Sequence, residues 1–237
     1  FEKDALRALA CGTASPLPHA TRAKPCVAVF AAGRFWVVDT GPGSWNRMAL
    51  LRVDGARIGG VLLTHFHSDH IGDLGEFDLN TWVRGRPAPL RVDGPPGVER
   101  VGAGCEEAYA LDAQYRIAHH GPELFSDAVG RLEPHTIAGP AGGGGPAVVL
   151  DEDGLRITAF AVTHDPVKPA YGYRFDYGGR SLVVSGDTTK DRAVIEAARG
   201  ADVLFHEAQA NHIVAQIGEA AAQADRPRIA KIMSDIP

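Results

Sequence analysis

The chain has 237 residues, of which 45% are hydrophobic, and this is enough to build one large core. The formal net charge at pH 7 is −5, whereas a general nucleic-acid-binding protein usually has a basic excess. No run of about eighteen apolar residues occurs, so the sequence predicts no transmembrane helix and no membrane partner. The sequence therefore argues against a transmembrane helix and against a general nucleic-acid-binding protein.

The three cysteines are Cys11, Cys26 and Cys105, and none forms a CxxC pair, so zinc bound by cysteine is not expected. Cys11 and Cys26 flank a loop rich in proline and alanine and can meet across a hairpin, which makes a disulfide between them a hypothesis. Such a bond would imply an oxidising compartment. We therefore expect a periplasmic or secreted protein if the disulfide forms, and a cytoplasmic one otherwise.

The N-terminal part predicts strands and helices in alternation. Residues 1–12 form a short helix or strand, and 26–31 with 34–39 form a hairpin around the tight turn at 32–33. Asp39 follows this hairpin, and it is either a turn residue or a support for a nearby site. A helix over 45–53 and a buried strand over 60–63 come next.

The segment directly after the buried strand is the most informative in the chain. It reads Thr-His-Phe-His-Ser-Asp-His, so that His65, His67, Asp69 and His70 stand within six residues. Imidazole and carboxylate groups are ligands of first-row metals, and this mixture suits zinc best. His65 and His67, two residues apart, can converge on one metal, while Asp69 and His70 face a second position. The sequence thus predicts a metal site where a strand ends.

The rest of the chain continues the strand–helix pattern. Helices are predicted over 73–82, 106–118, 190–199 and 209–224, and strands over 90–92, 155–162, 170–177, 180–185 and 201–205. The glycine-rich segment 139–146 lacks a phosphate-binding motif and is predicted to be a mobile surface loop.

Polar side chains follow four of these apolar strands directly. The strand over 60–63 is followed by the residues from His65 to His70, and the strand over 155–162 by His164. The strand over 180–185 is followed by Asp187, and the strand over 201–205 by His206 and Glu207. Strand ends at one edge of a sheet lie close together, so these groups are expected to share one metal site. The second half repeats the hairpin and strand–helix order of the first, which indicates two sheets faced by helices.

The HxHxDH motif at 65–70 resembles that of the metallo-β-lactamase superfamily, and the resemblance covers nearly the whole chain. Residues 164–175 resemble the third-ligand segment of its ribonuclease Z and metal-dependent arylsulfatase-like branch. Ser185-Gly186-Asp187-Thr188 resembles the bridging-aspartate turn of that branch, and His206-Glu207-Ala208 resembles its HEA element. The resemblance implies an α/β fold, a four-layer αββα metallo-β-lactamase sandwich of two mixed sheets faced by helices.

The resemblance also implies a set of metal ligands. His65, His67 and His164 would bind one zinc ion, Asp69 and His70 would bind a second, and Asp187 would bridge the two. Manganese or iron are alternatives to zinc. A hydroxide held between the metals would act as the nucleophile. Of the catalytic residues, Asp69 would orient the hydroxide or take its proton, Glu207 would orient a proton donor for the leaving group, and His206 would support the site.

One departure from the family concerns the last metal ligand. The family supplies a further histidine after the HEA element and its helix, but here no histidine follows His212. We expect residues 1–237 to form one domain. Two explanations for the missing histidine remain open: the C-terminal strand that carries the last ligand is missing from these residues, or His212 or a water molecule takes the place of that ligand.

We therefore expect a metal-dependent hydrolase of phosphodiester or sulfate ester bonds. The alternatives are a hydrolase of cyclic esters or amides, of the lactonase or β-lactamase type, and a non-catalytic metal-binding protein with a degraded second site. Two observations favour a small-molecule ester over tRNA as the substrate. The net charge of the chain is negative, and the sequence shows no long insertion of the kind that ribonuclease Z normally carries as an arm that grips tRNA. A homodimer is a further expectation.

Overall fold

The computed structural model describes residues 5–140 and 144–236. The chain divides into two compact units, Phe1–Phe205 and His206–Pro237, which are described separately. The expectation of a single domain over 1–237 stays a prediction. Part of the predicted glycine-rich loop, residues 141–143, lies outside the described residues.

The first sheet of the larger unit carries the metal motif. Its six strands lie in sequence order, and the bounds are β1 (Arg7–Gly12), β2 (Cys26–Ala31), β3 (Arg34–Val38), β4 (Ile58–Leu62), β5 (Leu90–Gly94) and β6 (Leu132–Thr136). The first three strands are antiparallel, and β3 to β6 run parallel. The predicted hairpin is confirmed: Ala32 and Gly33 join β2 and β3 with φ of 52° and 74°, as a two-residue hairpin turn requires. Val61 and Leu62 of β4 belong to apolar clusters on opposite faces of the sheet, so this strand is covered on both faces, in agreement with its apolar sequence.

The second sheet contains β7 (Ala147–Glu152), β8 (Leu155–His164), β9 (Val167–Tyr177), β10 (Arg180–Val184) and β11 (Val203–Phe205). Its spatial order is β11-β10-β9-β8-β7. Strands β7 to β10 are antiparallel neighbours, whereas β11 runs parallel to β10. Both sheets are therefore mixed.

Three apolar clusters separate four layers. The first cluster lies between the first sheet and its helices and includes Phe35 and Phe77. The second lies between the two sheets around Trp36, and the third lies under the last helix of this unit around Val194.

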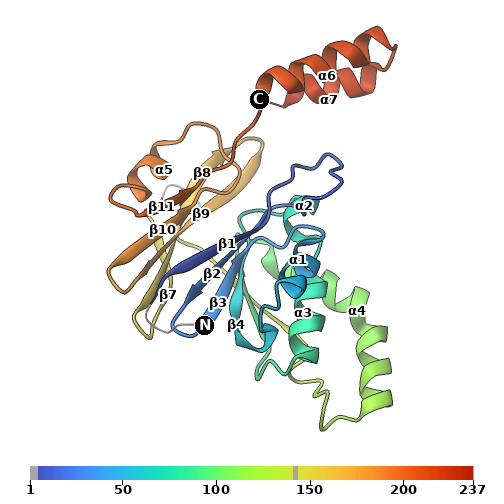
Figure 1. Ribbon diagram of the computed structural model, residues 1–237, viewed down its shortest axis with the longest axis vertical. Coiled ribbons are helices and arrows are strands. Elements are labelled where there is room, and N and C mark those ends of the chain that lie inside the picture. Colours follow the sequence, from blue (N-terminus) through green and yellow to red (C-terminus); the bar gives the residue numbers. More distant parts are fainter. Residues whose placement is uncertain (1–4, 141–143, 237) are drawn as a thin grey trace. The chain divides into compact units, whose positions relative to one another are not determined.

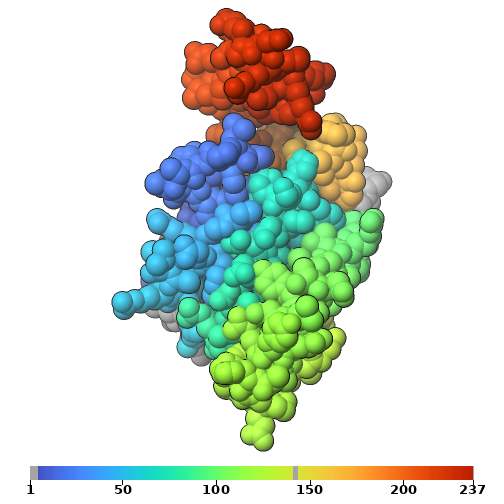
Figure 2. Space-filling model, turned by 90° about the vertical axis from the view of Figure 1, so that its right-hand side faces the viewer, coloured from blue at the N-terminus to red at the C-terminus, as the bar shows by residue number. Residues whose placement is uncertain are grey.

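The helices of this unit are α1 (Ser44–Leu50), η1 (Gly55–Arg57), α2 (Ser68–Ile71), α3 (Leu74–Val83), α4 (Val98–His120) and α5 (Arg192–Ala197). Helices α1 to α4 cover the outer face of the first sheet and α5 covers the second (Figure 1). Figure 2 shows the helical face, with the segment of α3 beside that of α4. Adjacent residues of β3, Phe35 and Trp36, belong to different clusters, so this strand is buried on both faces. The predicted αββα sandwich is confirmed.

Besides the short helices η1 and α2, the elements β6, β7 and α7 were not predicted from the sequence. Strand β6 reads Leu-Glu-Pro-His-Thr, which lacks alternation, and its proline is tolerated because the strand pairs only with β5. Strand β7 follows the glycine-rich segment and reads Ala-Val-Val-Leu-Asp-Glu, a short β-branched run that sequence reasoning left unassigned. In the smaller unit, α6 (Asn211–Gln223) packs against α7 (Pro227–Asp235), which has proline in its first turn and lies in a segment that sequence reasoning left unassigned. No helix in the described residues has the length and hydropathy to cross a membrane.

The hypothetical disulfide is present. Cys11, at the end of β1, is bonded to Cys26, at the start of β2, and both are buried. The bond closes the loop that joins these two strands. Disulfides are typical of oxidising compartments, but the compartment of this protein stays a prediction.

We expect the paired substitutions Cys11→Ser and Cys26→Ser to lower the free energy of unfolding by about 3 kcal/mol. The bond links residues 15 positions apart, and a loop of that size restricts the unfolded chain by about this amount. Denaturant unfolding measures the difference, with Cys105→Ser as the control because Cys105 is not in a disulfide. A non-reducing peptide map in which both thiols are free would contradict the bond itself.

Two helical glycines should respond to alanine with opposite signs. A Cβ at Gly75 of α3 would lie 2.2 Å from the ring of Tyr109 on α4, so Gly75→Ala should destabilise by about 1–3 kcal/mol. A Cβ at Gly104, exposed on α4, meets nothing within 4 Å, and Gly104→Ala should stabilise by about 1 kcal/mol through helix propensity alone. Thermal unfolding of the two variants checks this. Equal shifts would contradict close packing between α3 and α4.

Candidate metal centre

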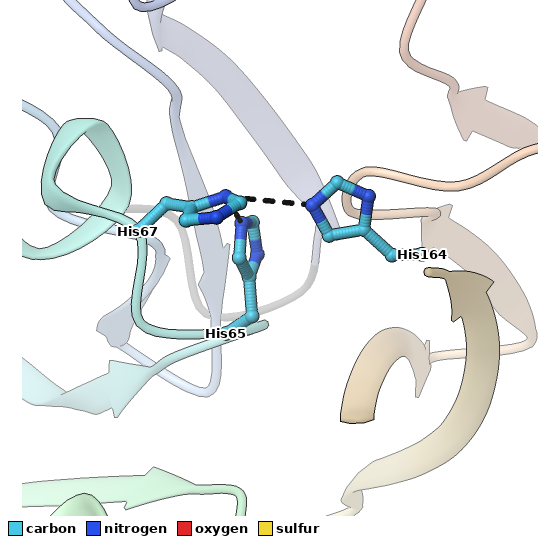
Figure 3. Close-up of side chains that lie close together, drawn as sticks. All are labelled: His65, His67 and His164. Carbon is cyan, nitrogen blue, oxygen red and sulfur yellow. Dashed lines mark hydrogen bonds between the residues drawn. The ribbon is translucent and has the colours of Figure 1, made fainter. Parts of the chain in front are cut away.

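Three predicted ligands converge between the two sheets. His65 follows β4, His67 precedes α2, and His164 ends β8 of the second sheet. The distance from His65 Nε2 to His67 Nδ1 is 2.9 Å, and that from His67 Nδ1 to His164 Nε2 is 3.4 Å (Figure 3). One nitrogen from each ring lies within 4.8 Å of the other two, which is a spacing that one metal ion spans. The structure thus brings together the three residues predicted to hold the first ion.

A second group shares His65 with the first. It contains His65, His70 and Asp187, again with donor atoms within 4.8 Å of one another. His70 Nε2 lies 3.4 Å from Asp187 Oδ2 and 3.8 Å from Asp69 Oδ2. The prediction assigned Asp69 and His70 to the second position and Asp187 to a bridge between the two. The structure brings these three side chains close together, but Asp69 is not a member of the compact group and His65 is.

Asp39 fixes the orientation of two histidines. Its carboxylate accepts hydrogen bonds from the backbone N–H of Thr64 at 2.8 Å and from the Thr64 hydroxyl at 2.9 Å. His70 Nδ1 lies 2.8 Å from the same carboxylate, and His65 Nδ1 lies 3.0 Å from the Thr64 hydroxyl oxygen. Since that hydroxyl donates to Asp39, His65 Nδ1 must be the donor to the hydroxyl. Both histidines then carry a proton on Nδ1 and direct Nε2 into the site.

Backbone contacts bring the second sheet up to this motif. The Tyr171 N–H donates to Thr64 O at 3.0 Å, and the buried Tyr173 hydroxyl donates to Leu63 O at 2.7 Å. Gly186 has φ of 64°, and a Cβ there would lie 2.7 Å from Tyr171 O and 3.1 Å from Thr64 Cβ. Only glycine fits this close approach, which places Asp187 opposite His70.

The electrostatics of the site follow from burial and from its carboxylates. Burial and the neighbouring His70 lower the pKa of His65 to about 3. Burial by itself would also lower the pKa of His70, but the carboxylates of Asp39 and Asp187 outweigh it and raise this pKa to about 10. For Asp187, burial opposes ionisation, yet the nearby imidazole of His70, whose Nε2 lies 3.4 Å from Asp187 Oδ2, lowers its pKa. The site therefore stabilises positive charge between these carboxylates.

The residues fit a bound metal ion. His70 Nε2 is buried and has no hydrogen-bond partner, although an unpaired buried nitrogen of this kind is costly. It lies among a carboxylate and other imidazole nitrogens, which are the donors that zinc, iron and manganese prefer. A divalent cation at this point would use the orphaned nitrogen.

Two predicted catalytic residues belong to the other unit. His206 and Glu207 begin that unit, and His206 Nδ1 lies 2.6 Å from the backbone carbonyl of Glu207. His212 lies within α6. The roles predicted for these residues stay predictions. Sequence reasoning left Asp39 as either a turn residue or a support for a nearby site, and it assigned no function to Thr64, whose small β-branched side chain gives no signal of its own.

The fold and the site agree with comparisons to known proteins. The family model described as beta-lactamase superfamily domain matches residues 34–233. Proteins named ribonuclease Z from Mycobacterium avium (strain 104) and Mycobacterium bovis (strain BCG / Pasteur 1173P2) are 40% and 39% identical to this chain over 209 residues, which are 87% of the chain and 71% of each relative. The chain therefore belongs to the metallo-β-lactamase superfamily and, within it, to the family of these ribonuclease Z relatives. It is a metal-dependent hydrolase.

Solved structures of lower identity share the fold. The short form of human tRNase Z has a TM-score of 0.67 at 21% identity, with 96% of this chain and 87% of that chain covered. The metallo-beta-lactamase fold protein YhfI from Bacillus subtilis has a TM-score of 0.59 at 16% identity, with 94% and 83% covered. These likenesses support the αββα architecture.

The expectation that a small-molecule ester is preferred over tRNA was wrong. It rested on the net charge of −5, whereas the relatives at 39–40% identity are named as ribonucleases. Net charge is a sum over the whole chain, but phosphate groups are recognised by local groups of cations and by the metal centre. A negative sum is therefore compatible with an RNA substrate.

Asp39→Asn should weaken metal binding by about 10- to 100-fold, because loss of the carboxylate frees both histidine orientations. Thr64→Val should have a smaller effect, since it removes only the link to His65. Competition with a metallochromic chelator measures both affinities. Asp93→Asn is the control, because Asp93 is also buried but pairs with Arg91. If Asp93→Asn weakened metal binding as much as Asp39→Asn, the orienting role would be wrong.

Proposed function

We propose that this protein cleaves phosphodiester bonds in RNA, with tRNA precursors as substrates and two divalent metal ions, preferably zinc, at the centre described above. The observation that carries the proposal is the convergence of His65, His67, His164, His70 and Asp187 in two adjacent ligand groups. The identity of about 40% to proteins named ribonuclease Z supports the choice of RNA.

The ligand groups divide between two positions. His65, His67 and His164 would hold one ion, and His70 with Asp187 and Asp69 would hold the other. When bound, such ions lower the pKa of a coordinated water toward neutrality and polarise phosphoryl oxygens. His65 Nε2 has one lone pair and would bind the ion of the first position, although it also lies within 4.8 Å of the donor atoms of the second group.

The carboxylates supply the proton chemistry. Asp69 is buried beside His70 Nε2, where it can accept the proton of the attacking water. Asp187 is more exposed and lies 3.4 Å from His70 Nε2, and it would bridge the two positions, as the family resemblance implies. We further propose that Glu207 orients the donor of a proton to the leaving oxygen and that His206 supports the ligands, as the family resemblance implies.

Elemental analysis and cleavage assays on the same samples test the proposal. Protein purified without chelator should contain about two zinc-like ions per chain and should cleave a tRNA precursor, and a chelator should abolish cleavage until metal is restored. His164→Ala should lower metal content and reduce cleavage by more than about 100-fold, beyond the effect typical of a supporting residue. His135→Ala is the matched control, because His135 on β6 faces Glu133 rather than the site.

Two results would contradict the proposal. Full metal content with hydrolysis of an aryl sulfate but no cleavage of RNA would exclude the RNA substrate. Protein that binds one ion or none and cleaves nothing would exclude a complete dinuclear centre.

A further inference from the structure

A cavity of about 240 Å³ lies directly beside the metal centre. Phe66 and His67 line it from the metal motif, Pro95 and Pro96 from the turn between β5 and α4, and residues 167–169 from the start of β9. His67 also belongs to the first ligand group, so a group seated in the cavity is next to the metal centre. Apart from His67, no residue that lines this cavity belongs to the ligand groups or takes part in the proton chemistry proposed above.

The walls of the cavity are apolar and stiff. Phe66 is half-buried and packs against the core between the first sheet and its helices. The ring also lies close to the turn after Pro96, since a Cβ at Gly97 would be 3.3 Å from Phe66 Cε2. Proline side chains have almost no rotamer freedom to lose, so this wall is preorganised for a flat apolar group.

One cation stands at the cavity. Lys168 Nζ forms an ion pair with Asp165 at 2.6 Å, and the two side chains are 74% and 60% exposed. An ion pair at this exposure contributes little, so the ammonium group is available to a phosphate at small cost. The cavity therefore combines an aromatic surface with a mobile positive charge.

The size of the cavity limits its occupant. Pockets for drug-sized ligands measure about 300–1,000 Å³, so this cavity suits one planar ring system rather than a whole nucleotide. Bases of single-stranded RNA are bound by stacking on aromatic side chains, and such stacking depends little on which base is present. Apart from His67 and Lys168, the lining residues carry no polar side chain that reads a base edge.

We propose that this cavity is a base-binding subsite, in which one nucleobase flanking the cleaved phosphodiester stacks against Phe66 while Lys168 contacts an adjoining phosphate. The proposal rests on the RNA substrate proposed above. It adds a specificity: the subsite requires a base at one flanking position but accepts any base there.

The test compares intact tRNA precursors with precursors in which either nucleotide flanking the cleaved bond lacks its base. The wild-type enzyme should lose about 5- to 150-fold in kcat/KM for the abasic substrate at one of the two positions, and little when one base replaces another. Phe66→Leu keeps an apolar side chain against the core and should cleave intact and abasic precursors equally slowly. Phe125→Leu is the control, because Phe125 is a buried ring that packs on Trp82 instead.

Lys168 is tested through the salt dependence of RNA binding. Lys168→Ala should reduce the slope of log affinity against log salt by about 0.7, as expected for one lost phosphate contact to single-stranded RNA. Arg156→Ala is the matched control, because Arg156 also forms an exposed ion pair, with Asp151. Arg156 lies near the start of β8, whereas Lys168 lies beyond the other end of that strand. An unchanged slope for Lys168→Ala would overturn the phosphate contact.

Failure of the subsite is distinguishable from failure of the proposed function. Precursor cleavage that is indifferent to the missing base at both positions would overturn the subsite and leave the RNA substrate standing. If no precursor is cleaved, the affinity of an RNA trinucleotide is measured by calorimetry with a chelator present. Binding that is weakened by Phe66→Leu would support the subsite, and equal affinity for intact and abasic trinucleotides would overturn it.

Discussion

The hydrogen bonds of Asp39 are the constraint on which the site depends. This residue has φ of 60°, a left-handed conformation that costs about 1–2 kcal/mol for most residues and that aspartate tolerates better than most. In this position its carboxylate binds Thr64 and His70 at once, and through Thr64 it determines which nitrogen of His65 carries the proton. The strained backbone of Asp39 therefore allows one carboxylate to fix the orientation of two buried imidazoles, those of His65 and His70. Backbone strain of this kind is concentrated at functional sites.

Much of the fold and most of the site were predictable because they follow from local patterns. The buried strand before His65 is apolar on both faces, since β4 lies between two layers, and the polar residues after it stand out against that background. The same contrast marks His164 and Asp187 at the ends of β8 and β10. Each signal is weak by itself, but the sheet edges bring His164 and Asp187 close to the histidines of the metal motif.

The remainder was not predictable because it depends on partners distant in the chain. Thr64 acts only through Asp39, which is 25 residues earlier, and its residue type is as common in plain strands. Strand β6 owes its existence to pairing with β5, because its own sequence has little strand propensity. The preference for a small-molecule ester over tRNA was wrong because it rested on net charge. Net charge is a property of the whole chain, whereas substrate binding depends on the groups at one face.

The ligands come from both sheets, and this has a consequence for the rest of the molecule. His65 and His67 follow β4 of the first sheet, whereas His164 ends β8 and Asp187 follows β10 of the second, so the distances between their donor atoms depend on how the sheets are aligned. A shift of about 1 Å in a reacting geometry can cost about 100-fold in rate. Residues such as Trp36 and Phe175, buried between the sheets, therefore bear on catalysis as spacers. Selection on activity would act on their volume even where stability alone would tolerate a change.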